Sequence, residues 1–192
     1  MENIELEFKR IKNIIYIKDN NLQLNIIPEC SFETNGINVF SPNSKSIPLF
    51  INKNVESHLK FIKIISDIYD KCSEYIETDY EFNPDVIINP LNKINDTTYI
   101  LNLYITDFNG NITASFYDNN NNLISLENLE NKTFSLYPAI NIDKFSLNKD
   151  KEKAYINLHL KEGFVDNIKN KRLLDFNKYK SYVNKKTNNV LN

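Results

Sequence analysis

The sequence has few of the residues that most catalytic and metal sites require. Its 192 residues include three glycines, two cysteines, two histidines and no tryptophan. The glycines are isolated from one another, whereas a loop that cradles phosphate groups needs closely spaced glycines. Cys30 and Cys72 lie far apart, without the Cys-x-x-Cys spacing or the nearby histidine pair of a zinc site. We therefore expect no metal site, no disulfide framework and a reducing, intracellular compartment.

Neither histidine belongs to a recognisable catalytic arrangement. His58 falls on a predicted helix and His159 on a predicted strand, and neither has a serine, cysteine or acidic residue nearby in a nucleophile pattern. A structural histidine is the favoured interpretation for both. Asp79, Glu81 and Asp85 could hold a metal, although solvated loop charge is the simpler explanation. The sequence thus predicts a protein that is not an enzyme and uses no cofactor.

Long apolar runs are absent as well. No stretch approaches the roughly 18 apolar residues of a membrane span, and the first ten residues lack the apolar core of a signal peptide. Hydrophobic residues make up 41% and charged residues 25%, values near those of globular domains, so wholesale disorder is not expected. We expect one domain over residues 1–165, a basic arm over residues 166–192 and no membrane partner.

Basic charge is concentrated at the C-terminal end. The formal net charge is -2, but residues 161–192 hold eight basic and three acidic residues, a balance of +5. The first 160 residues therefore carry a balance of -7. The arm is the more favourable partner for a polyanion.

Two stretches alternate with the period of a half-buried strand. In residues 99–107, Leu101, Leu103 and Ile105 fall on one face, while Tyr104 and Thr106 fall on the other. Residues 154–160 alternate in the same way, with Tyr155, Asn157 and His159 on the polar face. Each stretch predicts a strand with one buried face and one face that carries aromatic and hydrogen-bonding side chains.

Turn signals predict further strands around these two. A hairpin is expected from 11–18 and 22–27, and another from 99–107 and 112–117 around Asn109-Gly110. Pro138 interrupts a strand at 134–145, which predicts an edge position, a bulge or a strand start. Residues 29–48 predict an irregular connection with a short strand at 36–40, and residues 86–88 predict another short strand.

One stretch has strong helical periodicity. Apolar residues recur at steps of three and four from Asn54 or Ser57 to about Glu77, which predicts a helix packed against a sheet. A coiled-coil partner is the alternative. The arm has the spacing of a short amphipathic helix near residues 171–183, and its last residues are expected to fray.

The outward strand face and the arm are candidates for binding nucleic acid. Bases stack on aromatic rings whatever their sequence, and lysine and arginine neutralise phosphates. The alternative is that these rings fill a sheet face beneath a helix and that the arm is merely solvated. The nominated residues are Lys12, Tyr16, Lys18, Tyr104, Lys153, Tyr155, His159 and Lys161, with Lys169, Lys171, Arg172, Phe176, Lys178, Tyr179, Lys180 and Tyr182 in the arm.

Several strands, one inserted helix and no catalytic set suggest an α+β, mainly β fold: a Greek-key barrel of antiparallel strands of the oligonucleotide-binding (OB) type, with a C-terminal helix or arm. The stretches at 99–114, 136–142 and 155–161 resemble the single-stranded DNA-binding proteins of poxviruses and related large cytoplasmic DNA viruses. The bias towards asparagine, isoleucine and lysine fits an AT-rich genome of this kind.

The resemblance implies a protein that coats single-stranded DNA during viral replication in the host cytoplasm, with viral replication proteins as further partners. RNA as a ligand and an oligomeric state stay open. Such proteins often end in an acidic tail, whereas this chain ends in a basic one. The alternative hypothesis is a non-enzymatic viral protein-interaction or virion-associated α/β domain, in which the outward aromatic residues contact another chain.

Overall fold

The computed structural model describes residues 6–11, 14–19, 22–41, 43–80, 86–107, 109–147 and 153–171. Within these residues, five strands close into a barrel in the order β12-β4-β6-β9-β13, and β13 returns to pair with β12. Four of the pairs are antiparallel, and β9 pairs with β13 in parallel through Tyr104 and His159. The five strands are β4 (Phe32–Thr34), β6 (Ser44–Asn52), β9 (Thr98–Tyr104), β12 (Lys132–Leu147) and β13 (Ala154–Asn170).

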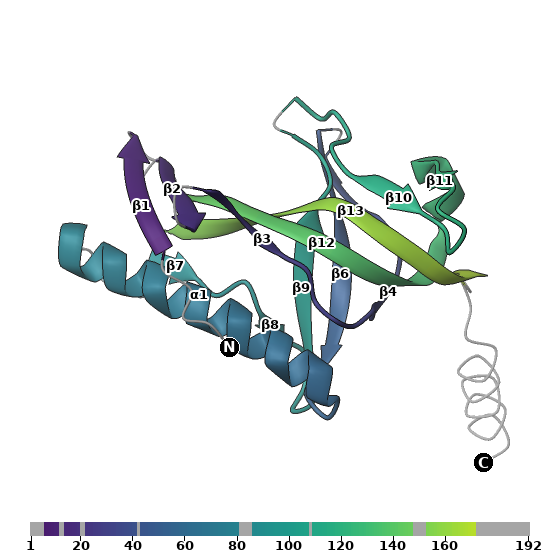
Figure 1. Ribbon diagram of the computed structural model, residues 1–192, viewed down its shortest axis with the longest axis horizontal. Helices are drawn as coiled ribbons and strands as arrows, with labels where there is room; N and C mark the ends of the chain where they lie inside the picture. The colour runs from purple at the N-terminus through teal and green to yellow at the C-terminus, as the bar shows by residue number, and fades with distance from the viewer. Residues whose placement is uncertain are drawn as a thin grey trace, which may run out of the picture.

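Alternation of apolar residues along these strands produces the barrel interior. Leu101 and Leu103 on β9 are fully buried, and Leu158 and Leu160 on β13 are at most 2% exposed. The mainly β barrel predicted from the sequence is confirmed. Figure 1 shows the long β12 and β13 running side by side across β6 and β9.

Short strands extend the barrel sheet at both ends. A three-stranded meander lies beside β12, and the hairpin predicted within it is confirmed by the pairing of β2 with β3. Two short strands continue the sheet beyond β13 at the other end. The meander consists of β1 (Leu6–Ile11), β2 (Ile14–Asp19) and β3 (Leu22–Ile26), and the two short strands are β10 (Ser115–Tyr117) and β11 (Leu123–Ile124). The remaining elements are β5 (Asn38–Ser41), β7 (Ile87–Ile88), β8 (Asn92–Lys93) and the 3-10 helix η2 (Leu126–Leu129).

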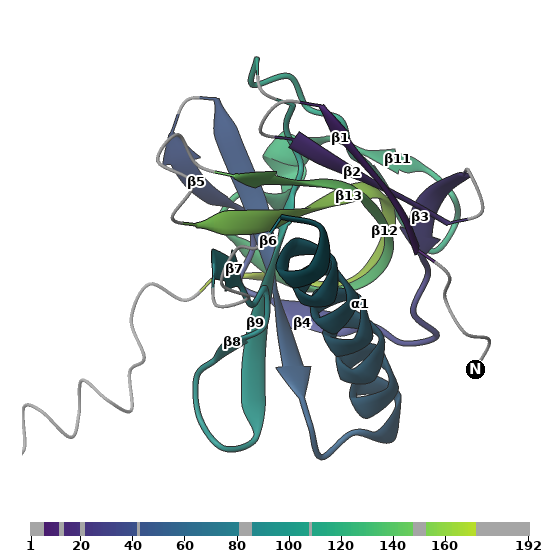
Figure 2. The same ribbon diagram turned by 90° about the vertical axis from the view of Figure 1, so that its left-hand side faces the viewer.

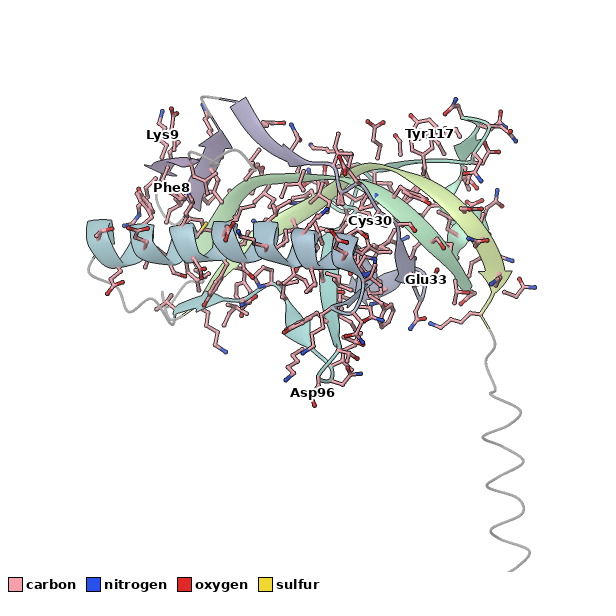
Figure 3. The ribbon with its side chains drawn as sticks, turned by 60° about the horizontal axis from the view of Figure 1, so that its bottom comes forward. Phe8, Lys9, Cys30, Glu33, Asp96 and Tyr117 are labelled. Carbon is pink, nitrogen blue, oxygen red and sulfur yellow. The ribbon has the colours of Figure 1, made fainter. Side chains whose placement is uncertain are left out.

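The predicted helix is confirmed as α1 (Glu56–Tyr80). Its apolar face is buried against the barrel, where Phe61 contacts Phe32 with ring centroids 4.9 Å apart. Figure 2 shows α1 lying in front of the barrel strands. Towards the other end of the helix, Phe8 of β1 stacks on Tyr75 with ring centroids 4.2 Å apart, which fixes the N-terminal meander to α1. Figure 3 shows Phe8 near this end of α1.

His58 has the structural role that the sequence favours. Its Nδ1 accepts a hydrogen bond from the Asn52 amide at 3.0 Å, and its Nε2 lies 3.0 Å from the Ser31 carbonyl oxygen, to which it donates in the matching tautomer. The ring also stacks on Phe32 with centroids 4.8 Å apart. The side chain therefore links the start of α1 to β4 and β6.

Two sequence predictions about the strands are wrong. The first is the irregular connection over residues 29–48, because residues 44–48 belong to the barrel strand β6. On the side of β6 away from β9, Pro48 lies between the residues that pair with β5 and the residue that pairs with β4, so a proline is tolerated there. The hairpin around Asn109-Gly110 is reduced to a tight turn with one bridge between Thr106 and Ile112. The returning strand β10 pairs with β13 instead.

The long β12–β13 ladder has three register shifts, after Thr133, Ala139 and Ile142 of β12, and the last two shape the candidate site. Asp143 is an extra residue on β12, and Lys161 is an extra residue on β13. A bulge reverses the alternation beyond it, so one more side chain turns outward at each position. The bulge at Lys161 lies opposite the step from Ala139 to Ile140, close to Pro138, and a bulge is one of the three alternatives that the proline predicts.

The arm lies largely outside the described residues. β13 continues through Asn170, five residues past the domain limit expected from the sequence, and the Lys171 amide donates to the Asn131 carbonyl at 2.9 Å. The helix predicted at 171–183 and the division at residue 165 stay predictions. In the part of the chain that the structure describes, no helix is long and apolar enough to cross a membrane.

Candidate nucleic-acid interface

A hollow of about 620 Å³ opens on the outer surface where β9 meets β13. It forms at this point because the parallel pair of Tyr104 and His159 places the end of β9 beside the middle of β13. Polar and aromatic side chains from five segments line it: Ser41, Asn43, Ser44, Tyr104, Thr106, Asp107, Thr113, Asn141, Asp143, Lys144, Ser146, Asn157, His159 and Lys161.

The floor of the hollow comes from the outward face of β13. Tyr155, Asn157, His159 and Lys161 alternate with buried residues, so they all point away from the barrel interior. The rings of Tyr104 and His159 lie 5.9 Å apart at an interplanar angle of 43°. This pair presents two adjacent rings to the solvent side of the sheet, with Tyr104 at 36% exposure.

The β12 bulge supplies one wall of the hollow. Because Asp143 is the extra residue, Lys144 faces outward opposite Asn157 rather than into the core. The Lys144 Nζ lies 3.9 Å from the Asp143 Oδ2, while the Asp143 Oδ1 is buried without a hydrogen-bond partner among the described residues. Tyr16 of β2 pairs with Lys144 and extends this wall towards the N-terminal meander.

The opposite wall is held by hydrogen bonds between the β5–β6 turn and the end of β9. The buried Thr106 hydroxyl donates to the Asn43 carbonyl at 3.3 Å and accepts from the Lys45 amide at 3.2 Å. Thr106 lies on the same face as Tyr104, as the sequence predicts, but it is only 4% exposed because the turn covers it. The wall is therefore fixed by hydrogen bonds between the Thr106 side chain and the backbone of the turn.

Asp107 organises the loop at the rim. Its carboxylate accepts hydrogen bonds from the Asn111 side chain, the Asn111 amide and the Asn109 amide, each at 2.9 Å. The Asn111 side chain is the largest cause of the lowered pKa of Asp107, and the amide donors lower it further. The Asp107 carboxylate therefore holds the loop in place through these hydrogen bonds.

Burial lowers the pKa of His159. The positive charges of Lys144 and Lys161 lower it further, and Asp143 opposes the shift. The imidazole is therefore neutral at neutral pH, in the form best suited to stacking and to neutral hydrogen bonding. The charged groups that line the hollow are two lysines and two aspartates, so its formal charge is balanced.

The structure brings together several of the nominated residues. Tyr104, His159 and Lys161 line the hollow, and Tyr155 lies at its edge because it pairs with Ser146. Tyr16 and Lys18 point the same way on β2. Lys153 is exposed at the start of β13. Their role in binding stays a prediction.

Other nominated residues lie elsewhere. Lys169 and Lys171 are exposed at and just beyond the far end of β13, more than about 20 Å along the strand from Lys161. The remainder fall outside the described residues: Lys12, Arg172, Phe176, Lys178, Tyr179, Lys180 and Tyr182.

The main residue that sequence reasoning missed is Lys144. Strict alternation from Ile140 and Ile142 would turn Lys144 into the core, and only the bulge at Asp143 reverses this. No pattern in the sequence predicts that bulge. Asn157 is correctly predicted to face outward, and its side-chain amide donates to the Ser146 hydroxyl at 3.1 Å. Among the described residues, no group of three or more His, Cys, Asp or Glu side chains could hold a metal ion.

No protein-family model matches the sequence, and no curated protein matches it. The fold does match solved structures. The single-stranded DNA-binding protein gp2.5 of bacteriophage T7 superposes with a TM-score of 0.58 at 10% identity, covering 80% of this chain and 91% of that one. The single-stranded DNA-binding protein of bacteriophage Enc34 gives 0.49 at 11% identity, covering 91% and 97%. At such identities the likeness to gp2.5 shows a shared OB-type fold.

Proposed function

We propose that this chain is a non-enzymatic protein that binds single-stranded DNA without sequence preference. The observation that carries the proposal is the cluster of Tyr104, His159 and Tyr155 on one outer face of the barrel, beside a hollow lined by Lys144 and Lys161. OB-type barrels use such a face for oligonucleotides. The description of gp2.5 as a single-stranded DNA-binding protein supports the same function here.

Stacking is the main source of affinity in this proposal. The rings at Tyr104 and Tyr155 are 36% and 47% exposed, and each stacked base contributes roughly 1 to 3 kcal/mol. Because every base has a flat face, rings bind without reading sequence. The amide of Asn157 and the hydroxyls around the hollow add hydrogen bonds to sugar or base edges.

Charge plays the smaller part on the barrel. Lys144 and Lys161 can each neutralise one phosphate, but Asp107 and Asp143 balance them within the hollow. The basic arm then supplies additional phosphate contacts. This division follows from the sequence balance of +5 over residues 161–192.

The proposal extends to a biological setting. We assign the chain to the replication of a large cytoplasmic DNA virus, where it coats exposed strands in the host cytoplasm alongside viral replication proteins. The support is the resemblance of residues 99–114, 136–142 and 155–161 to the poxvirus proteins. Localisation of the tagged chain to viral DNA foci in infected cells tests this setting, and a diffuse distribution that ignores those foci would contradict it.

The site is tested by the double variant Tyr104→Ala/Tyr155→Ala. Removing two stacking rings should weaken binding of labelled oligothymidine by at least about tenfold, since about 1.4 kcal/mol corresponds to a factor of ten. Fluorescence anisotropy measures the affinity, and urea unfolding checks that the fold persists. The matched control is Leu59→Ala, because Leu59 on α1 is 47% exposed, as Tyr155 is. Equal affinity of the double variant and wild type would remove these rings from the site.

A further inference from the structure

A second group of exposed rings lies further along the same long strands. Tyr137 on β12 pairs with Phe164 on β13, Phe164 pairs with Tyr117 on β10, and Tyr117 pairs with Leu123 on β11. Directly paired residues in adjacent strands share a face, so these four side chains form one row across four strands. We call this row the distal platform.

The distal platform is open to solvent. Tyr137 is 47% exposed, Phe164 is 44% exposed and Leu123 is 70% exposed, and Tyr117 is half-buried. The rings of Tyr117 and Phe164 lie 5.9 Å apart at 43°, the same spacing and angle as Tyr104 and His159. A single exposed ring is ordinary, but an unbroken row of apolar side chains marks a binding surface.

The bulge at Lys161 places this platform on the same side of β13 as the hollow. His159 faces outward at an odd position, so strict alternation would turn Phe164 into the barrel. The extra residue at Lys161 reverses the phase, and Gly163 and Val165 are buried instead. One residue therefore keeps the outward face continuous from Tyr155 to Phe164.

The two aromatic sites lie within reach of one strand of nucleic acid. His159 and Phe164 are about 13 Å apart along β13, counted at the usual rise per residue with one residue taken up by the bulge. One OB fold covers about 4 to 16 nucleotides, so a bound strand can span both sites. Figure 3 shows Tyr117 at the end of the long strands opposite to Phe8.

We propose that the distal platform is a second base-stacking site, which takes the bases of single-stranded DNA that extend beyond the hollow. The proposal rests on the proposed function, because it assigns to the platform the same ligand as the hollow. Lys161 lies between the two sites and faces a phosphate as the strand passes. Glu162, which also faces outward there, limits the charge attraction, so stacking dominates at the platform.

The test compares oligothymidines of two lengths. One of about four nucleotides fills the hollow alone, and one of about 16 nucleotides reaches both sites. The variant is Tyr137→Ala/Phe164→Ala, and Phe164→Leu retains apolar bulk without an aromatic face. The matched control is Ile94→Ala, since Ile94 is 52% exposed in the loop before β9, away from both sites. Urea unfolding confirms that each variant is folded.

The expected result is a loss of at least about tenfold in affinity for the long oligonucleotide and no change for the short one, since each stacked base contributes a factor of this size. Phe164→Leu should show part of the same loss.

Equal affinity of the double variant and wild type for the long oligonucleotide would overturn the proposal that the distal platform binds DNA and leave the proposed function intact. Absence of binding by the wild-type chain at either length would instead overturn the proposed function. A wild-type dimer in sedimentation that the double variant abolishes would assign the platform to a second copy, against this proposal.

Discussion

Single residues decide which side chains reach the candidate interface. The extra residue Asp143 turns Lys144 outward, and the extra residue Lys161 does the same for Phe164. His159 lies between these two points, where burial is deep enough to favour its neutral form. The face proposed to bind DNA therefore depends on two local departures from regular strand geometry.

The lowered pKa of His159 predicts a pH effect on stability. Its pKa in the fold lies below the ordinary value of 6.5, so the unfolded chain binds the proton more tightly than the folded chain does. The stabilisation is complete above pH 6.5 and is lost as the pH falls through 6.5 towards the lower folded pKa. Between about pH 7 and pH 5, wild type should lose more free energy of unfolding than His159→Gln does.

Urea unfolding midpoints of the two proteins across that range check the His159 prediction. Carboxylates that titrate in the same range are common to both proteins and cancel in the difference. Parallel pH profiles would show that His159 has the same proton affinity in the folded and unfolded chains.

At the scale of elements, α1 and the barrel depend on each other. Phe61 is 1% exposed and packs on Phe32, which lies on the short barrel strand β4. We expect Phe61→Ala to lower the free energy of unfolding by about 3 to 5 kcal/mol, because a large buried ring leaves a cavity. Leu59→Ala, on the exposed side of the same helix, should change it by about 0.5 kcal/mol or less. Urea denaturation measures both, and similar losses in the two variants would contradict this packing.

The sequence predicts those elements in which local pattern and tertiary environment agree. The helix and the buried faces of β9 and β13 follow from periodicity, because each presents one apolar face to a single core. The sequence does not predict β6, because Pro48 argues against a central strand. It does not predict β1 either, because the exposed Glu7 and Lys9 alternate with residues that are only half-buried. The pairing of β10 with β13 depends on which sheet edge is open, and that is a property of the whole barrel.

The same limit applies to the candidate site. Tyr104, Tyr155 and His159 are identified correctly as outward residues because regular alternation holds where they lie. Lys144 and Phe164 could not be predicted, since each lies beyond a bulge that reverses the pattern, and the rest of the distal platform depends on strand pairings that the sequence does not show. Sequence reasoning therefore finds the centre of this face and misses its extensions.

At the scale of the whole molecule, the barrel offers rings on one continuous face, while the cationic excess lies in the arm. The described lysines on or beside this face are Lys18, Lys144, Lys153 and Lys161. If these four alone neutralise phosphates, the logarithm of the affinity should fall with the logarithm of salt at a slope of about -3. A steeper slope would assign phosphate contacts to the arm as well.

The most direct test of the central claim is an anisotropy titration of the full chain with labelled oligothymidine at about 50 mM salt, followed by competition with unlabelled duplex of equal length. We predict saturable binding that weakens as salt rises and that the duplex displaces poorly, because paired bases cannot lie flat on Tyr104 and Tyr155. No binding at low salt, or equal displacement by duplex and single strand, would contradict the account.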